Sequence, residues 1–232
     1  MSVRVAVLAS GGGSNLQAIL DHLDRLGERR RAEVTLVVSD RPRAGALERA
    51  RVRGLTAIAL PAGDHDTMLD ALLAEHAVEI VALAGYLKLV PPAVTRRFRG
   101  RMLNVHPALL PAFGGPGMYG ARVHRAVLES GARLSGPTVH FVDEVYDHGA
   151  IIAQWPVPVF EEDTPETLAA RVLRVEHALY PRVLEAVASE AIALDDDGRV
   201  RGAFLVGSQG AIFTLPNADP DLDAAIDIAL GL

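Results

Sequence analysis

Residues 3–27 read VRVAVLASGGGSNLQAILDHLDRLG, and this stretch decides the fold. Its first seven residues alternate in polarity and then become continuously apolar, which is typical of a buried strand. A glycine-rich turn follows at 10–15. Beyond the turn, apolar residues recur with the spacing of one helix face, at Leu16, Ile19, Leu20 and Leu23. The stretch therefore predicts a strand, a tight turn and a helix, the opening unit of an α/β protein.

The same alternation continues along the first half of the chain. Further strands are expected at 34–39, 56–60, 80–84 and 101–105, and helices at 44–53 and 67–76. Pro91-Pro92 opens a short helix. Strands that alternate with helices form βαβ units, so we expect an α/β fold with a mostly parallel twisted sheet flanked by helices.

The second half has a different pattern. Two β-rich runs, 137–142 and 151–159, flank the polar segment 143–150, which predicts a strand, a loop and a strand. Before them, 113–120 contains four glycines and a proline, and is expected to be a mobile loop.

A long helix is expected after these strands, because apolar residues share one face at Leu168, Val172, Val175 and Leu179. Asp163 and Glu166 have the spacing of a capping box, with Pro165 in the first turn. Pro181 is expected to kink or end this helix.

The C-terminal part predicts less. Residues 195–198, Asp-Asp-Asp-Gly, are a turn signal, and 221–230 are compatible with a last helix. No repeat or low-complexity linker divides the chain. We therefore expect one α/β domain over 1–189, followed by a small C-terminal extension, 190–232, packed on that domain or trailing from it.

The composition excludes several classes of protein. The chain has 232 residues, of which 50% are hydrophobic and 22% charged, enough to bury one sizeable core. It has no cysteine, so disulfides, thiolate metal sites and a cysteine nucleophile are excluded. No apolar run is long enough to span a bilayer and no cleavage signature is present, so we expect a cytoplasmic protein without a membrane partner.

The net charge of −6 lies entirely within 189–232, where eight acidic residues accompany two arginines. Residues 1–188 balance to zero. A body without a basic excess argues against a nucleic-acid partner.

The glycine turn allows three interpretations. Gly11, Gly13 and Asp40 fit part of a dinucleotide-binding pattern, but Leu16 replaces its third glycine. No lysine follows, as a P-loop would require. The remaining interpretation is an anion site on the backbone N–H groups at the helix N-terminus, or simply a turn and a helix cap.

Asn104-Val105-His106 leaves a predicted strand with its first and third side chains on one side of the sheet. An amide donor and an imidazole suit acyl transfer, which develops an oxyanion and moves a proton. Ordinary hydrogen bonding is the alternative at this point.

The segment 140–148 holds two histidines and three acidic residues, but without the spacing of a metal site, so no metal is expected. A single carboxylate from this loop that orients His106 is the simpler hypothesis.

Five blocks together resemble one family: 7–15, 83–87, 103–111 (LNVHPALLP), 138–142 and 176–181. They resemble the phosphoribosylglycinamide formyltransferases, a family of folate-dependent enzymes with a Rossmann-like formyltransferase fold. The resemblance implies transfer of a formyl group from 10-formyltetrahydrofolate to the amino group of glycinamide ribonucleotide, a step of purine biosynthesis.

The resemblance also implies roles for particular residues. The catalytic set is Asn104, His106 and Asp147. The ribonucleotide-binding set is Gly13, Ser14, Asn15 and Glu176. The folate-binding set is Leu87, Lys88, Leu89, Val90, Val142, Glu144, Val145 and Tyr146. The partners implied are the two small-molecule substrates, and a homodimer is left open.

Three departures from the family pattern affect these expectations. The loop after Pro111 is longer than in the shorter members, no Arg or Lys lies between Pro61 and Ala77, and Leu173 replaces a polar residue one turn before Glu176. Weaker or rearranged phosphate contacts, for example from Arg174 or the long loop, are therefore expected.

Three alternative functions compete with this one, and only the last belongs to a different class of protein. A methionyl-tRNA formyltransferase should carry an RNA-binding domain and lack the Gly-Ser-Asn turn, whereas only about 40 acid-rich residues follow the long helix here. A formyltetrahydrofolate hydrolase should carry an N-terminal regulatory domain, but this chain starts at the first strand. A dinucleotide-binding module is favoured only by Gly11, Gly13 and Asp40.

Overall fold

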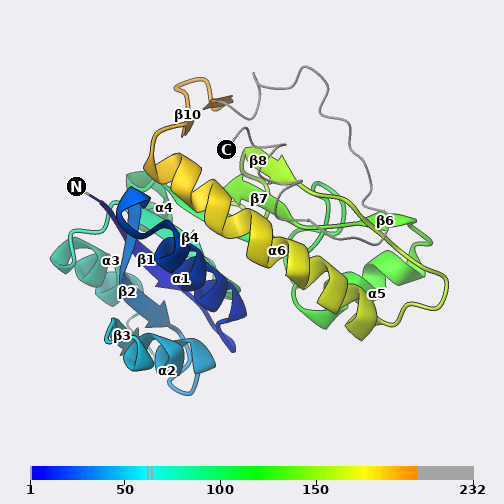
Figure 1. Cartoon of the computed structure of the whole chain (residues 1–232), viewed down its shortest axis with the longest axis horizontal. Coiled ribbons are helices and arrows are strands. Elements are labelled where there is room, and N and C mark those ends of the chain that lie inside the picture. Colours follow the sequence, from blue (N-terminus) through cyan, green and yellow to red (C-terminus); the bar gives the residue numbers. More distant parts are fainter. Residues whose placement is uncertain (1, 62, 64, 203–232) are drawn as a thin grey trace.

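The computed structural model describes residues 2–61, 63 and 65–202 (Figure 1). Its centre is a sheet of seven strands in the order β3-β2-β1-β4-β5-β7-β8. These strands are β1 (Val3–Leu8), β2 (Ala32–Ser39), β3 (Thr56–Ala59), β4 (Ile80–Leu83), β5 (Met102–His106), β7 (Thr138–Phe141) and β8 (Ile151–Gln154). β1 to β5 pair in parallel, whereas β7 and β8 are antiparallel to their neighbours. The prediction of a mostly parallel α/β sheet is confirmed.

Helices cover both faces of this sheet. They are α1 (Ser14–Leu26) with the 3₁₀ turn η1 (Gly27–Arg29), α2 (Gly45–Val52), α3 (His65–Glu75), α4 (Pro92–Arg97), α5 (Ala121–Glu129) and α6 (Pro165–Ala188). The core on one face contains α1, α2 and α6, and the core on the other contains α3 and α4. In Figure 1, α6 is the long yellow helix that crosses the sheet beside α1.

β1 shows why the sheet is buried on both faces. Val5 and Val7 point into the core under α1 and α6, and Ala6 and Leu8 point into the core under α3 and α4. All four are fully buried. A parallel strand covered on both sides reads as a nearly continuous apolar run, which explains the pattern at the start of the chain.

Two short strand pairs lie outside the main sheet. β6 (Leu134–Ser135) pairs with β9 (Val157–Pro158), and β10 (Ile192–Leu194) pairs with β11 (Val200–Gly202). The expected single run 151–159 is therefore two strands, because the backbone N–H of Trp155 bonds to the Pro137 carbonyl and Pro156 has no N–H to continue the ladder. The predicted turn at 195–198 is confirmed by the β10–β11 hairpin.

Pro181 does not end the helix, since α6 continues through it to Ala188. A proline inside a helix costs about 3 kcal/mol. Here Leu179, Tyr180, Val183 and Leu184 on either side of it are buried in the core, and packing of that kind outweighs such a cost.

The expected capping box of Asp163 and Glu166 is wrong by one residue. Thr164 is the N-cap, and it exchanges hydrogen bonds with Thr167. Asp163 instead forms two hydrogen bonds with the guanidinium of Arg171, at 2.7 and 2.8 Å, and tethers the first turn of α6 to the helix two turns on.

Some features lie beyond the sequence expectations. α5 was not anticipated, and the helix expected at 221–230 lies outside the described residues. The division at 189 and 190 stays a prediction, although Ile192 of β10 belongs to the main core. Within the described part of the chain, no helix has the length and apolar character needed to cross a membrane.

Candidate active site

A cavity of about 490 Å³ opens at the carboxyl ends of β4 and β5. In open α/β sheets this edge is where ligands bind, next to the point where the strand order reverses. Five parts of the chain line most of the cavity: the segment after β4, the end of β5, the loop 115–120, the loop 142–147 and the middle of α6.

The glycine turn forms a helix N-terminus without a side-chain cap. Gly13 has φ 77° and is followed at once by α1. A Cβ on Gly13 would lie 2.6 Å from Cα of Ala46, so both the conformation and the space demand glycine. The first N–H groups of α1 are therefore available to an anion, although Gly13 and Ser14 do not line the cavity itself.

A guanidinium also lies at this turn. Arg49 of α2 donates from Nε to the Gly12 carbonyl at 2.8 Å and from Nη1 to Gln17 at 3.1 Å. Arg49 therefore places a positive charge beside the turn, and Arg174 is exposed; neither arginine lines the cavity.

Asp40 has a structural role that competes with the dinucleotide interpretation. Its carboxylate accepts a hydrogen bond from the Ser10 hydroxyl, at 2.5 Å, and that hydroxyl in turn accepts from the backbone N–H of Leu87. Asp40 thereby fixes the segment after β4 rather than standing free for a ribose.

Asn15 and Glu176 meet inside the protein. Nδ2 of Asn15 donates to Oε2 of Glu176 at 2.7 Å, and both residues line the cavity. Burial raises the pKa of Glu176 to about 7, although the Asn15 hydrogen bond acts in the opposite direction. The neighbouring Leu173 lines the cavity and offers it no polar atom.

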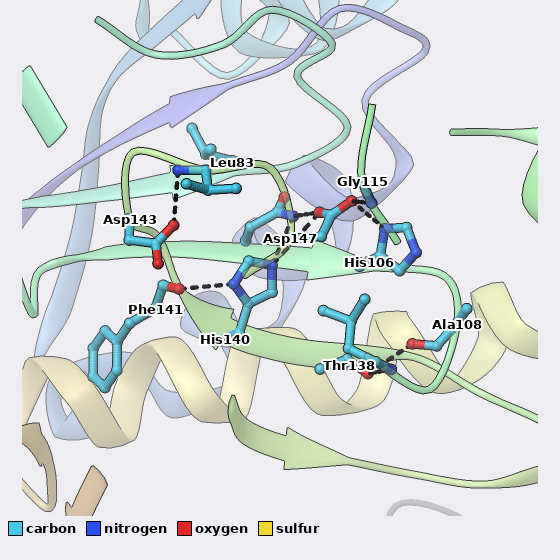
Figure 2. Close-up of polar contacts among 12 residues, drawn as sticks. Leu83, His106, Ala108, Gly115, Thr138, His140, Phe141, Asp143 and Asp147 are labelled. Carbon is cyan, nitrogen blue, oxygen red and sulfur yellow. Dashed lines mark hydrogen bonds and ion pairs between the residues drawn. The ribbon is translucent and has the colours of Figure 1, made fainter. Parts of the chain in front are cut away.

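The expected catalytic residues Asn104, His106 and Asp147 lie together, and Figure 2 shows His106 and His140 on either side of Asp147. Asp147 lies between two imidazoles: its Oδ2 is 3.4 Å from Nδ1 of His106, and its Oδ1 is 3.8 Å from Nε2 of His140. Nδ2 of Asn104 donates to Oδ1 of Asp147 at 3.4 Å. The structure therefore brings an amide, a carboxylate and an imidazole to one point of the cavity.

His106 is surrounded by acceptors. Its Nε2 lies 2.9 Å from the Phe113 carbonyl and its Nδ1 faces Asp147, so the imidazolium would satisfy both contacts. Burial lowers the pKa of His106, while Asp147 and the Phe113 carbonyl act to raise it. The ring thus combines a buried position with contacts that favour its charged form.

The long loop after Pro111 touches the carboxylate of Asp147. The backbone N–H of Gly115 donates to Oδ2 of Asp147 at 2.9 Å. Phe113 and Asp147 both have a positive φ, 56° and 54°. Residues other than glycine rarely adopt this backbone conformation outside functional or strained positions. The loop whose contacts could not be inferred from the sequence is therefore part of the site.

Most of the expected folate-binding residues line the same cavity. They are Leu87, Lys88, Leu89, Val90, Val142, Val145 and Tyr146. Glu144 does not line it and forms an exposed ion pair with Arg96 at 2.8 Å. Nζ of Lys88 lies 2.9 Å from Nε2 of His65, which stands in the segment that lacks Arg and Lys.

Sequence reasoning missed two histidines of the cavity. His124 of α5 is buried there, and its Nδ1 has no hydrogen bond among the residues described. His140 is opposite Asn104 in the β5–β7 pairing. The signal for His140 was its strand alternation with Thr138, while α5 gave no comparable signal. Residues 2–61, 63 and 65–202 include no group of three or more side chains suited to a metal ion.

Comparisons with known proteins agree with this geometry. The family model described as Formyl transferase matches residues 3–184. Phosphoribosylglycinamide formyltransferase, chloroplastic, of Arabidopsis thaliana is 46% identical over 202 residues, which cover 84% of this chain and 68% of that protein. Its namesake from Vigna unguiculata is 46% identical over 201 residues, which cover 84% of this chain and 64% of that protein.

Solved structures give the same result. Glycinamide ribonucleotide transformylase 1 from Symbiobacterium toebii superposes with a TM-score of 0.78 at 41% identity, over 86% of this chain and 93% of that one. A formyltetrahydrofolate deformylase from Pseudomonas syringae, at 23% identity and a TM-score of 0.75, shares the fold over 86% of this chain and 65% of that one. From the family model and these relatives, the chain belongs to the formyl transferase family.

Proposed function

We propose that the protein transfers the formyl group of 10-formyltetrahydrofolate to the amino group of glycinamide ribonucleotide, in purine biosynthesis. The observation that carries this proposal is the cluster of Asn104, His106 and Asp147 in one cavity. The names of the plant and bacterial relatives support the same pair of substrates.

The ribonucleotide is assigned to the side of the cavity next to α1 and α6. Its phosphate binds the N–H groups of Gly13, Ser14 and Asn15, where the helix dipole and Arg49 favour negative charge. Its ribose hydroxyls donate to Glu176, whose carboxylate reaches the cavity from α6. This arrangement points the amine toward Asn104.

The folate is assigned to the opposite side. Its pterin lies between Leu87–Val90 and Val142–Tyr146, where backbone groups match its polar edge and apolar side chains cover its faces. Lys88, with His65 beside it, pairs with a carboxylate of the glutamate tail. Hydrogen exchange with a bound folate analogue should protect both segments; protection of neither would contradict the assignment.

The chemistry needs a stabilised oxyanion and a route for one proton. The lone pair of the substrate amine forms a bond to the formyl carbon, and the carbonyl electrons move to the oxygen. Asn104 donates to that oxygen, and so does the imidazolium of His106 when its Nε2–H leaves the Phe113 carbonyl. Asp147 stabilises the imidazolium from the Nδ1 side. The ammonium loses its proton through water beside Asp147. When the oxyanion collapses, the bond to N10 of the folate breaks and N10 takes up a proton.

A coupled assay tests the proposal. Absorbance would follow deformylation of 10-formyltetrahydrofolate with and without glycinamide ribonucleotide, and with a Glu176→Ala variant as control. We expect turnover that depends on the ribonucleotide and that is impaired in the variant. Turnover in water alone, independent of the ribonucleotide, would favour a deformylase, the activity named for the more distant structural relative.

The remaining expectations of the sequence stay predictions. They are the cytoplasmic location, the homodimer left open, and the lack of a nucleic-acid partner. Gel filtration with light scattering would decide the oligomeric state, and filter binding with tRNA would test the nucleic-acid prediction.

A further inference from the structure

His140 is a buried histidine that the proposed chemistry does not use. It is 2% exposed, and its side chain lies on the same face of the sheet as Asn104, its direct partner across the antiparallel β5–β7 pair. We infer that His140 is a positioning residue, which sets the orientation of the Asn104 amide by accepting one of its N–H groups.

The tautomer of His140 follows from its contacts. Nδ1 lies 2.7 Å from the carbonyl oxygen of Phe141, which can only accept, so Nδ1 carries the proton and donates it (Figure 2). In the neutral ring Nε2 is then a bare lone pair. Nδ2 of Asn104 lies 3.1 Å from Nε2, and an amide nitrogen can only donate. The hydrogen bond therefore runs from Asn104 to His140.

The position of Asp147 is consistent with this direction of the hydrogen bond. Its Oδ1 is 3.8 Å from Nε2 of His140, beyond hydrogen-bond range, as expected when both atoms carry lone pairs. Nδ2 of Asn104 contacts both of them, at 3.1 Å from the imidazole and 3.4 Å from the carboxylate. Two N–H groups thus meet two acceptors.

The orientation of the amide has a consequence for catalysis. If the Asn104 amide turned by 180°, its oxygen would face the lone pairs of both His140 and Asp147. His140 therefore keeps the NH₂ group on this side. The N–H aimed at Asp147 makes the longer bond, so it is the one that can be shared with the formyl oxygen as negative charge develops, while His140 keeps the other N–H engaged.

The charge state of the ring agrees with an acceptor role. Burial lowers the pKa of His140, and nearby His106 acts in the same direction, although the Phe141 carbonyl, Asp147 and Asp143 oppose it. A neutral ring is required, because an N–H on Nε2 would repel the amide N–H groups. His140 acts through Asn104, since no other side chain forms a hydrogen bond with its Nε2 within the described part of the site.

This inference rests on the proposed formyl transfer, and a double-mutant cycle tests it. His140→Leu removes the acceptor, and His140→Gln keeps an oxygen acceptor near the same place. We expect His140→Leu to lower kcat by about tenfold or more, with both KM values within about threefold, because a freely turning amide loses much of the effect of one oxyanion donor. His140→Gln should recover most of that loss.

The cycle separates positioning from a merely structural role. In an Asn104→Ala background, His140→Leu should cost no more than about twofold, because the group that it positions is gone. If the two changes multiplied, or if the glutamine variant were as poor as the leucine variant, the inference would be overturned. Circular dichroism and thermal unfolding of each variant check that it is folded.

A measurement on the unchanged protein keeps the test independent of variant folding and of activity. The ¹⁵N spectrum of the histidine rings should show His140 protonated at Nδ1 and bare at Nε2 at neutral pH. The opposite tautomer, or a charged ring, would overturn the inference. A wild-type protein without formyl transfer would instead contradict the proposed function and leave this tautomer unaffected.

Discussion

Glu176→Gln should stabilise the folded protein at alkaline pH while weakening ribonucleotide binding. The carboxylate is buried, and its pKa is raised from 4.5 to about 7. Since the folded form binds the proton more tightly than the unfolded chain, the stability associated with this proton is fully present below pH 4.5. It is lost as the pH rises through about 7. The glutamine side chain would not titrate and would keep an oxygen acceptor for Asn15.

The size of the effect follows from the same values. A tenfold change in proton affinity is worth about 1.36 kcal/mol, so ionising Glu176 in the folded state costs about 3 kcal/mol. For a domain of this size about 1 kcal/mol shifts Tm by about 2–4 °C, so the variant should gain up to about 6–12 °C at pH 8. Near pH 5 the difference should fall below about 1 kcal/mol, because wild-type Glu176 is then protonated.

Activity should change in the opposite direction. A hydrogen bond to a charged acceptor is worth about 1 kcal/mol more than one to a neutral acceptor, so the ribonucleotide KM should rise about fivefold above pH 7. In the wild type this KM should rise as the pH falls through about 7, whereas the variant should lack that dependence.

Scanning calorimetry from pH 5 to 8 and initial rates over the same range would measure both effects. Glu190→Gln is a matched control, because its side chain is 81% exposed near the end of α6. A Glu176→Gln variant less stable than the wild type at pH 8, or a Tm difference independent of pH, would refute the reasoning.

Three further predictions concern the rest of the site. Ser14→Pro removes an N–H at the start of α1 and disfavours the Gly13 conformation. In steady-state kinetics it should raise the ribonucleotide KM at least about tenfold and leave the folate KM unchanged. An unchanged ribonucleotide KM would refute the phosphate site. Arg49→Leu should raise the same KM about three- to tenfold, and Arg49→Lys should raise it less. Equal increases in the two variants would count against a role for the positive charge of Arg49. Asn104→Ala should lower kcat about 10²- to 10³-fold. His106→Ala combined with Asp147→Asn should lower kcat much less than the product of the two single effects. If the single effects on the rate multiplied in single-turnover kinetics, the assigned roles would be contradicted.

The fold was largely predictable because apolar residues recur at different intervals in its strands and in its helices. Continuous apolar runs such as Val34–Ser39 and Ile80–Ala84 predicted buried strands, and they lie in the centre of the sheet. Rules based on neighbouring residues in the sequence failed where packing against distant residues determines the structure. Pro181 reads as a helix end, but the core holds the helix on both sides of it.

Without the family resemblance, individual site residues were predictable mainly where a motif lies along one strand. Asn104 and His106 are two residues apart on β5, so the alternation of a strand was enough to pair them. His140 is 36 residues away from Asn104 and becomes its neighbour only through the register of an antiparallel pair. The family resemblance assigned Glu144 to the folate with the rest of its loop, but its side chain pairs with Arg96 on the surface.

The reversal of direction at β7 has a consequence for how new activities could arise on this scaffold. In a wholly parallel sheet, only strand ends and the loops beyond them face the crevice. Since β7 runs against β5, Thr138 and His140 lie beside His106 and Asn104. Substituting His140 would change the surroundings of the reacting groups directly, whereas the Thr138 hydroxyl binds the Ala108 carbonyl and the Leu110 N–H, so a change there would also shift the loop after β5. Directed evolution toward another acyl donor or acceptor could therefore begin on this strand, where the backbone is fixed on both sides.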